Sequence, residues 1–134
     1  MDELKEIEKR KIEELKKKYN GDKMKSKIEV NDNNFEKEVI EKSKKVPVVV
    51  DFWAEWCMPC LILGPVLEKM MTESKGKFIL AKLNVDKNPV TSKAYEIQSI
   101  PAVKLFKNGK LAGEFVGALP EVQVKDWLDK NLGD

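Results

Sequence analysis

Val46-Pro47-Val48-Val49-Val50-Asp51-Phe52-Trp53 runs directly into Ala54-Glu55-Trp56-Cys57-Met58-Pro59-Cys60, and this stretch decides the fold. Its first half is a nearly continuous apolar run, which predicts a central strand covered on both faces. The segment that begins at Cys57 carries apolar residues at helical spacing and therefore predicts a helix. The sequence thus places a Cys-x-x-Cys pair at a strand-to-helix junction.

Cys57 and Cys60 are the only two cysteines among the 134 residues. At a helix N-terminus, free N–H groups and the aligned peptide dipoles favour a thiolate. We therefore predict that Cys57 is the exposed sulfur with the lower pKa. Cys60 lies one turn along the same helix, shielded but close enough to attack a mixed disulfide on Cys57. The spacing favours thiol–disulfide exchange.

A zinc site and an inert pair of core thiols are the two alternative interpretations of the cysteine pair. Zinc needs four ligands, or three and a water, drawn mainly from Cys and His. The chain has no histidine and no third cysteine, so only Asp or Glu could complete such a site, and no metal is predicted. An inert pair of core thiols is disfavoured because Pro59 and Trp56 are unusual at the start of an ordinary core helix.

The composition excludes several classes of function. The 25 basic and 23 acidic residues leave a net charge of +2, which provides no electrostatic basis for binding nucleic acid or an anionic membrane. The first residues lack the apolar region of a secretory signal, and no run reaches the roughly 20 apolar residues that span a bilayer. We therefore expect a cytoplasmic protein, where a cysteine pair is more often catalytic or metal-binding than structural.

The chain is predicted to divide into residues 1–26 and residues 27–134. Residues 2–19 place a narrow apolar stripe at helical spacing among charged residues, and Asn20-Gly21 supplies a left-handed stop. This predicts a charged amphipathic helix followed by a linker. Docking of the stripe on the domain or on a second copy is favoured, because isolated helices of this length are marginal in water. A partner-specific adaptor and membrane-surface binding are the alternatives.

From Lys27 onward, strand and helix patterns alternate. Strands are predicted over 27–30, 46–53, 77–84, 102–106 and 110–116. Helices are predicted after each of the first three strands and after the last. The order βαβαβαββα predicts an α/β fold with a mixed central sheet, parallel at the crossovers and antiparallel at one edge.

Local signals mark the ends of several of these elements. Asp32 or Asn33 is predicted to cap the first of these helices. Asn88-Pro89 fits the start of a short helix, with proline at its first position. Asn108-Gly109 between two strands is the strongest two-residue hairpin signal.

The stretch from Val50 to Cys57 resembles the active-site strand of thioredoxins. The resemblance continues, in order and spacing, through Ala81–Asp86, Ser99–Pro101, Leu105–Gly109 and Val116–Leu119. It covers residues 27–133 and implies a thioredoxin-like three-layer α/β/α fold. Residues 1–26 have no counterpart in the thioredoxin pattern.

The resemblance implies roles for four catalytic residues and no cofactor beyond a redox-active disulfide. Cys57 would be the attacking thiolate and Cys60 the resolving thiol. Asp51 matches a buried acid that moves the proton of the second cysteine, and burial should raise its pKa. A strand-end Asp facing water is the alternative. Lys82 matches the lysine beside that acid, and an ordinary strand lysine is the alternative with equal weight.

The resemblance also implies a rim that binds protein substrates. Pro101 would follow a cis peptide bond and face the disulfide, which leaves the backbone of Ile100 free to pair with an extended substrate. The predicted substrate-binding residues are Trp56, Met58, Pro59, Ile100, Pro101, Gly117 and Ala118. Trp53 is interpreted as a packing residue.

Two positions depart from the thioredoxin pattern. Met58 replaces the usual glycine between the cysteines, and Leu61 stands where a basic residue commonly follows the second cysteine. Loss of a nearby positive charge should stabilise a thiolate less, so the redox potential of the family is not carried over. Both changes make the rim more apolar, and we hypothesise that it favours hydrophobic or partly unfolded substrates.

The sequence therefore predicts a protein disulfide reductase that maintains reduced thiols in cytosolic proteins. Its expected partners are disulfide-containing proteins and an electron donor of the thioredoxin-reductase type, with no nucleic acid and no membrane. Self-association through the N-terminal helix is a further expectation. A disulfide oxidase or isomerase with a less reducing potential is one alternative. An adaptor that uses the fold and the N-terminal helix for assembly is the other.

Overall fold

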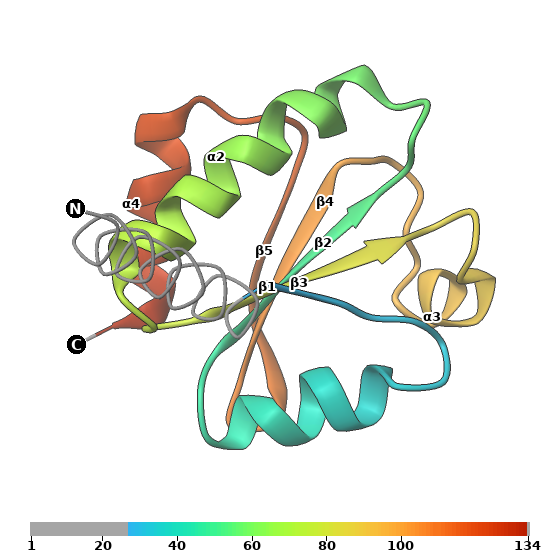
Figure 1. Cartoon of the computed structure of the whole chain (residues 1–134), viewed down its shortest axis with the longest axis horizontal. Coiled ribbons are helices and arrows are strands. Elements are labelled where there is room, and N and C mark those ends of the chain that lie inside the picture. Colours follow the sequence, from blue (N-terminus) through green and yellow to red (C-terminus); the bar gives the residue numbers. More distant parts are fainter. Residues whose placement is uncertain (1–26, 134) are drawn as a thin grey trace, which may run out of the picture.

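The computed structural model describes residues 27–133 (Figure 1). The predicted N-terminal helix and linker, residues 1–26, lie outside the described residues. The described elements are β1 (Lys27–Glu29), η1 (Glu36–Glu41), η2 (Lys42–Lys44), β2 (Val48–Trp53), α2 (Met58–Ser74), β3 (Ile79–Asn84), α3 (Pro89–Ala94), β4 (Ala102–Lys107), β5 (Lys110–Val116) and α4 (Glu121–Leu132). The predicted order of element types is confirmed, with a π-helical segment (η1) and a 3-10 turn (η2) as the first helical element.

The five strands form one mixed sheet in the order β1-β3-β2-β4-β5. β3 pairs in parallel with β1 and β2, whereas β4 pairs antiparallel with β2 and β5. The predicted hairpin is present, since β4 and β5 pair antiparallel. Its turn residues Asn108 and Gly109 adopt φ values of 57° and 82°. Positive φ at both turn residues suits the twist of the flanking strands. β2 therefore lies at the centre of the sheet and β5 at an edge.

Helices cover both faces of the sheet, which makes three layers (Figure 1). Val49 of β2 packs with Leu63 and Leu67 of α2 in one apolar cluster, which α4 completes. Val50 and Phe52 belong to a second cluster on the opposite face, with side chains from the η1 region. Successive side chains of a strand point to opposite faces, so β2 must be apolar on both.

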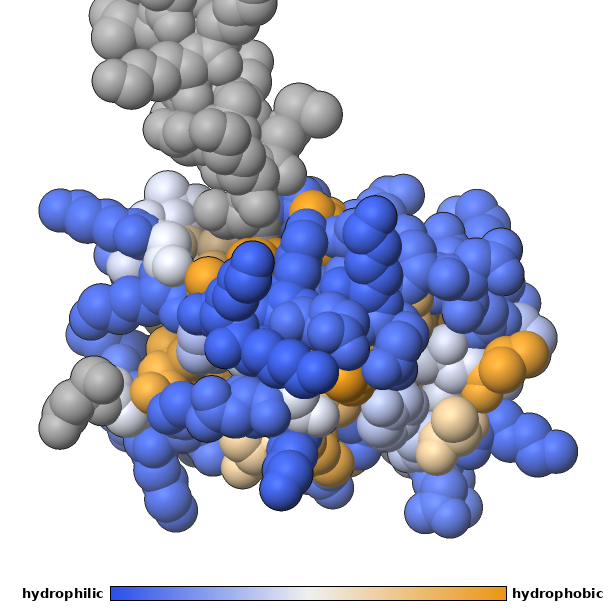
Figure 2. Space-filling view, turned by 90° about the horizontal axis from the view of Figure 1, so that it is seen from below, coloured by the Kyte–Doolittle hydropathy of each residue, from blue (hydrophilic) through white to orange (hydrophobic). Residues whose placement is uncertain are grey.

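One face of β5 packs against a helix, and the other face is exposed. Phe115 packs against Trp127 of α4, with ring centroids 4.8 Å apart. On the opposite face, the apolar cluster contains no residue of β5, and Leu111 and Val116 are exposed. The side of the molecule that carries η1 is mostly hydrophilic, with apolar residues only in small separate areas (Figure 2).

The prediction that Asp32 or Asn33 caps the first helix is wrong. The side chain of Asn31 accepts the hydrogen bond from the backbone N–H of Asn33 instead, at 2.9 Å. The carboxylate of Asp32 accepts from the backbone N–H groups of Val90 and Thr91, at 3.3 and 2.8 Å, at the start of α3. A cap that comes from 59 residues away leaves no local signal in the sequence.

Candidate active site

The cysteine pair lies at the junction between β2 and α2. Cys57 is the N-cap of α2, with an extended backbone, and its Sγ accepts a hydrogen bond from the backbone N–H of Cys60 at 3.3 Å. Pro59 stands in the first turn, where its missing N–H removes no bond within the helix. The Cys-x-Pro-Cys sequence therefore builds its own helix start, in which the N–H of Cys60 is directed at the sulfur of Cys57.

Cys57 and Cys60 form a disulfide, with their Cα atoms 5.2 Å apart. Both residues are buried, with exposed fractions of 4% and 3%. The prediction that Cys57 is the exposed sulfur is therefore wrong for the oxidised form. Its side chain turns back over the helix start and packs among Ala54, Trp53 and Ile100. Position on the helix, rather than exposure, distinguishes the two sulfurs.

Asp51 lies inside the protein on β2, as the resemblance implied, and not at a strand end facing water. The residue is completely buried, and neither carboxylate oxygen has a hydrogen-bond partner. Burial raises the pKa of Asp51 to about 6, opposed by the positive charge of Lys82 and reinforced by the negative charge of Glu68. A carboxyl group with such a pKa can accept or release a proton near neutral pH.

Lys82 stands opposite Asp51 in the parallel register of β2 and β3. Its Nζ lies 4.9 Å from the centroid of the Trp53 ring, in a cation–π contact. A Cβ at Gly64 of α2 would lie 3.3 Å from this Nζ, so the glycine leaves room for the lysine. Lys82 therefore lowers the pKa of Asp51 by its charge, and its ammonium group packs over an indole ring. The interpretation of Trp53 as a packing residue is confirmed.

The rim predicted from the resemblance is drawn from three separate parts of the chain. The Ile100–Pro101 peptide bond is cis, as the resemblance implied. The backbone N–H of Gly117 donates to the carbonyl of Pro101 at 2.8 Å, which joins the end of β5 to the start of β4. Gly117 has a φ of 96°, a conformation that favours glycine.

The rim residues differ in their exposure. Trp56 and Met58 are 69% and 67% exposed beside the disulfide. Ile100 is half-buried and packs on the disulfide, whereas Pro101 is buried. Pro59 and Ala118 are exposed. Contact of these residues with substrate stays a prediction.

Asp86 is a site residue that sequence reasoning missed. The indole Nε1 of Trp56 donates a hydrogen bond to a carboxylate oxygen of Asp86 at 2.8 Å. The side chain of Asn84 accepts the backbone N–H of Asp86 at 3.0 Å and so shapes the loop after β3. This loop therefore holds the exposed ring of Trp56. The only local signal was Asn84-x-Asp86 after a strand, and the partner lies 30 residues away.

The described part of the chain offers neither a cluster of metal ligands nor a membrane-spanning helix. Residues 27–133 contain no group of three or more His, Cys, Asp or Glu side chains that could hold a metal ion. Over the same range, no helix is long and apolar enough to cross a membrane.

The thioredoxin family model matches residues 25–130 of the chain. The thioredoxin of Buchnera aphidicola subsp. Baizongia pistaciae is 50% identical over 105 residues, which cover 78% of this chain and 94% of that protein. The thioredoxin of Chlorobaculum thiosulfatiphilum is 45% identical over 106 residues, which cover 79% and 96%. The thioredoxin of Acidithiobacillus ferridurans is 47% identical over 103 residues, which cover 77% and 94%.

These matches agree with the geometry of the site, in which a disulfide spans the first turn of a helix that follows the central strand. Members of the family need disulfide substrates and a reductase as electron donor. The chain belongs to the thioredoxin family and is a thiol–disulfide oxidoreductase that reduces protein disulfides by dithiol–disulfide exchange.

Proposed function

We propose that the chain is a general disulfide reductase for cytoplasmic proteins, with Cys57 as the attacking and Cys60 as the resolving cysteine. The thiolate of Cys57 attacks one sulfur of a substrate disulfide, and the other substrate sulfur leaves as a thiolate. The thiolate of Cys60 then attacks the sulfur of Cys57, which releases the second substrate thiolate and forms the Cys57–Cys60 disulfide. Two electrons pass to the substrate. The observation that carries the proposal is this disulfide across the N-cap of α2.

Asp51 is proposed to accept the proton of Cys60 before the resolving step. Strand alternation puts Asp51 on the same face of β2 as Val49, which packs against α2. Its raised pKa and its lack of hydrogen-bond partners support this role, because the carboxylate is held in an environment that favours protonation. Lys82 is proposed to keep the pKa of Asp51 from rising further.

The rim is proposed to favour apolar or partly unfolded segments of substrate proteins. Met58, Leu61 and Ile62 are all exposed on the first turns of α2, at positions that share one helix face. Trp56, on the other side of Cys57 in the sequence, adds a further exposed apolar ring. Contiguous exposed apolar surface of this kind is typical of binding sites.

Recycling requires two electrons for each substrate reduced, and we propose a thioredoxin-reductase-type enzyme as their source. Residues 1–26, for which the sequence predicts a charged amphipathic helix and a linker, are proposed to dock on the domain or to mediate self-association. An oxidase or isomerase differs from the reductase in the reduction potential of its disulfide. An adaptor differs in binding its partners without the cysteines.

Trapping with Cys60→Ser tests the proposal, with insulin as a disulfide-containing protein. The variant should accumulate a mixed disulfide through Cys57, because the resolving thiol is absent. Cys57→Ser is the matched control and should trap nothing. Partners that stay bound after both cysteines are replaced would favour the adaptor instead. Equilibration with a glutathione couple separates the reductase from the oxidase or isomerase. A midpoint reduction potential of the Cys57–Cys60 disulfide above roughly −200 mV would favour the oxidase or isomerase.

A further inference from the structure

Met58 is the one methionine of the described residues whose side chain is exposed. Its exposed fraction is 67%, whereas Met70 and Met71, on the same helix, are 7% and 2% exposed. The difference follows from position, because Met58 is the first residue of α2 and the other two lie in the apolar cluster beneath the helix. An exposed thioether is open to oxidants, and a buried one is shielded from them.

The disulfide makes Met58 the sulfur most open to attack in the described part of the chain. Cys57 and Cys60 are joined to each other and are only 4% and 3% exposed. A cysteine in a disulfide has no thiolate, which is the form of cysteine that reacts with oxidants. An oxidant that reaches this end of the oxidised protein therefore meets the thioether of Met58 before either cysteine.

A sulfoxide at Met58 would change a surface that is otherwise apolar. Met58, Leu61 and Ile62 share one face of the first turns of α2, and all three are exposed. Oxidation replaces the apolar thioether by a polar group whose oxygen accepts hydrogen bonds. An apolar segment laid on this face would have to remove water from that oxygen, which costs free energy unless a donor replaces the water. The change therefore acts on the binding of substrate, and the two cysteines that exchange stay as they are.

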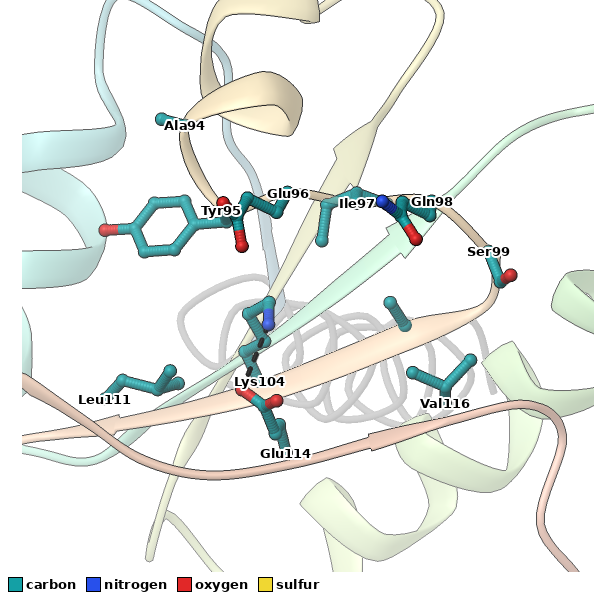
Figure 3. A pocket seen from close by; sticks show the side chains of 11 residues that line it. Ala94, Tyr95, Glu96, Ile97, Gln98, Ser99, Lys104, Leu111, Glu114 and Val116 are labelled. Carbon is teal, nitrogen blue, oxygen red and sulfur yellow. Dashed lines mark hydrogen bonds and ion pairs between the residues drawn. The ribbon is translucent and has the colours of Figure 1, made fainter.

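A groove beside β5 offers a place for a control, because it contains no sulfur. It has a volume of about 470 Å³ and lies between Ala94–Ser99 and the strands β4 and β5 (Figure 3). None of its lining residues is a methionine or a cysteine. Leu111 lies at the end opposite Val116, about 17 Å along β5, and is 45% exposed (Figure 3). A methionine at this position would be accessible without belonging to the Cys57–Cys60 motif.

We propose that Met58 is a site of reversible oxidation by hydroperoxides, and that its sulfoxide weakens the binding of apolar protein substrates. The thioether sulfur attacks the terminal oxygen of a hydroperoxide, the O–O bond breaks and an S–O bond forms. The proton of the transferred oxygen passes to the leaving alkoxide, which departs as the alcohol, or as water from hydrogen peroxide. The sulfur loses two electrons and the peroxide gains them. A methionine sulfoxide reductase restores the thioether. The proposal rests on the reductase function proposed above and adds its regulation.

Peptide mapping by mass spectrometry tests the site of oxidation. The full-length disulfide form is treated briefly with dilute hydrogen peroxide, and each methionine is scored for an added oxygen atom. Met58 should be oxidised about tenfold faster than Met70, in keeping with their exposed fractions of 67% and 7%. Equal rates at the two residues, or no added oxygen at Met58, would overturn the proposal.

The effect on binding is measured with two substrates, and dithiothreitol supplies the electrons. One is the symmetric disulfide of a short peptide with leucines beside its cysteine, and the other is oxidised glutathione, which is small and polar. After removal of the peroxide, KM of the wild type for the peptide should rise about fivefold, while kcat and KM for oxidised glutathione stay within about twofold. Methionine sulfoxide reductase should reverse the rise. An unchanged KM for the peptide in protein oxidised at Met58 would contradict the proposal.

Met58→Leu is the matched control, because leucine is apolar and of similar volume but has no thioether. This variant keeps the methionines at positions 1, 24, 70 and 71. Each protein is compared with itself before and after treatment, and KM of Met58→Leu should not change. The double variant Met58→Leu, Leu111→Met regains an exposed thioether in the groove beside β5, and its KM should not change either. A rise in KM in either control would place the effect at another residue and overturn the proposal.

Failure of regulation at Met58 and failure of the proposed function give different results. An untreated wild type that does not reduce insulin would contradict the reductase function and, with it, the effect on substrate binding. An active wild type whose KM does not respond to oxidation of Met58 would contradict the regulation alone.

Discussion

Strands β2 and β5 belong to one sheet and both end beside the disulfide, yet their surroundings are opposite. The first five residues of β2 are fully buried, whereas β5 has no buried residue. β2 leads into Cys57, and β5 leads into Gly117. The buried strand changes the chemistry of a carboxyl group, because desolvation raises the pKa of Asp51. The exposed strand leaves side chains accessible to solvent, because no helix of the described residues covers one of its faces.

The largest expected difference between the two strands is in stability. Phe52 of β2 is completely buried in the apolar cluster on the η1 face. Phe52→Ala should lower the free energy of unfolding by about 3–5 kcal/mol, because it removes a buried ring and leaves a cavity. Urea denaturation of the oxidised protein measures the change. A loss below about 1 kcal/mol would mean that the core around β2 collapses freely into the space.

The second prediction concerns the pH dependence that Asp51 confers. Its pKa is about 6 in the folded protein and 3.8 in the unfolded chain, so between these pH values the folded state keeps a proton that the unfolded state has lost. The contribution of Asp51 to stability therefore falls as pH rises from 3.8 to 6 and then stays constant. At 1.36 kcal/mol for each unit, the penalty above pH 6 is about 3 kcal/mol.

Asp51→Asn should remove this penalty, since an amide does not ionise. The change in the free energy of unfolding from pH 3.5 to pH 8 should therefore be about 3 kcal/mol more positive in Asp51→Asn than in the wild type, other groups contributing equally to both. Denaturant titrations of both proteins at the two pH values measure the difference. An identical pH dependence in the two proteins would show that Asp51 is hydrated. Burial in β2 would then not raise the pKa of its carboxyl group, and β2 and β5 would differ only in packing.

The smallest expected effect is at the exposed edge. Val116 is 60% exposed and belongs to neither large apolar cluster. Val116→Ser should change the free energy of unfolding by about 0.5 kcal/mol or less, as exposed substitutions usually do. Urea denaturation alongside Phe52→Ala checks this. A loss well above 1 kcal/mol would mean that β5 supports the fold, and the two strands would be more alike than their burial suggests.

Local patterns in the sequence predicted the elements that build the site. The apolar run before Cys57 identified a strand covered on both faces, whereas the burial of Asp51 followed from the resemblance to thioredoxins. Asn108-Gly109 identified the hairpin between β4 and β5. These features depend on residues within a few positions of one another, so periodicity and turn chemistry are sufficient to find them.

Contacts between distant parts of the chain escaped prediction. Asp32 caps α3 instead of the helix that follows it, and Asp86 holds the indole of Trp56. Cys57 is buried because Ile100, from a loop 43 residues later, packs with it in the same small apolar cluster. Each of these contacts depends on which elements the fold brings together. The sequence could not predict them, because the same residue types can pair with several different partners.

The sequence by itself determined the chemistry of this protein. Two cysteines three apart at a helix start, without a histidine or a third cysteine, leave thiol–disulfide exchange as the favoured use. Only the tertiary structure decided what surrounds that chemistry: the burial of both sulfurs, the loop that holds Trp56, and the groove beside β5. Reactivity depends on atoms close together in the chain, whereas burial and grooves depend on how distant segments pack.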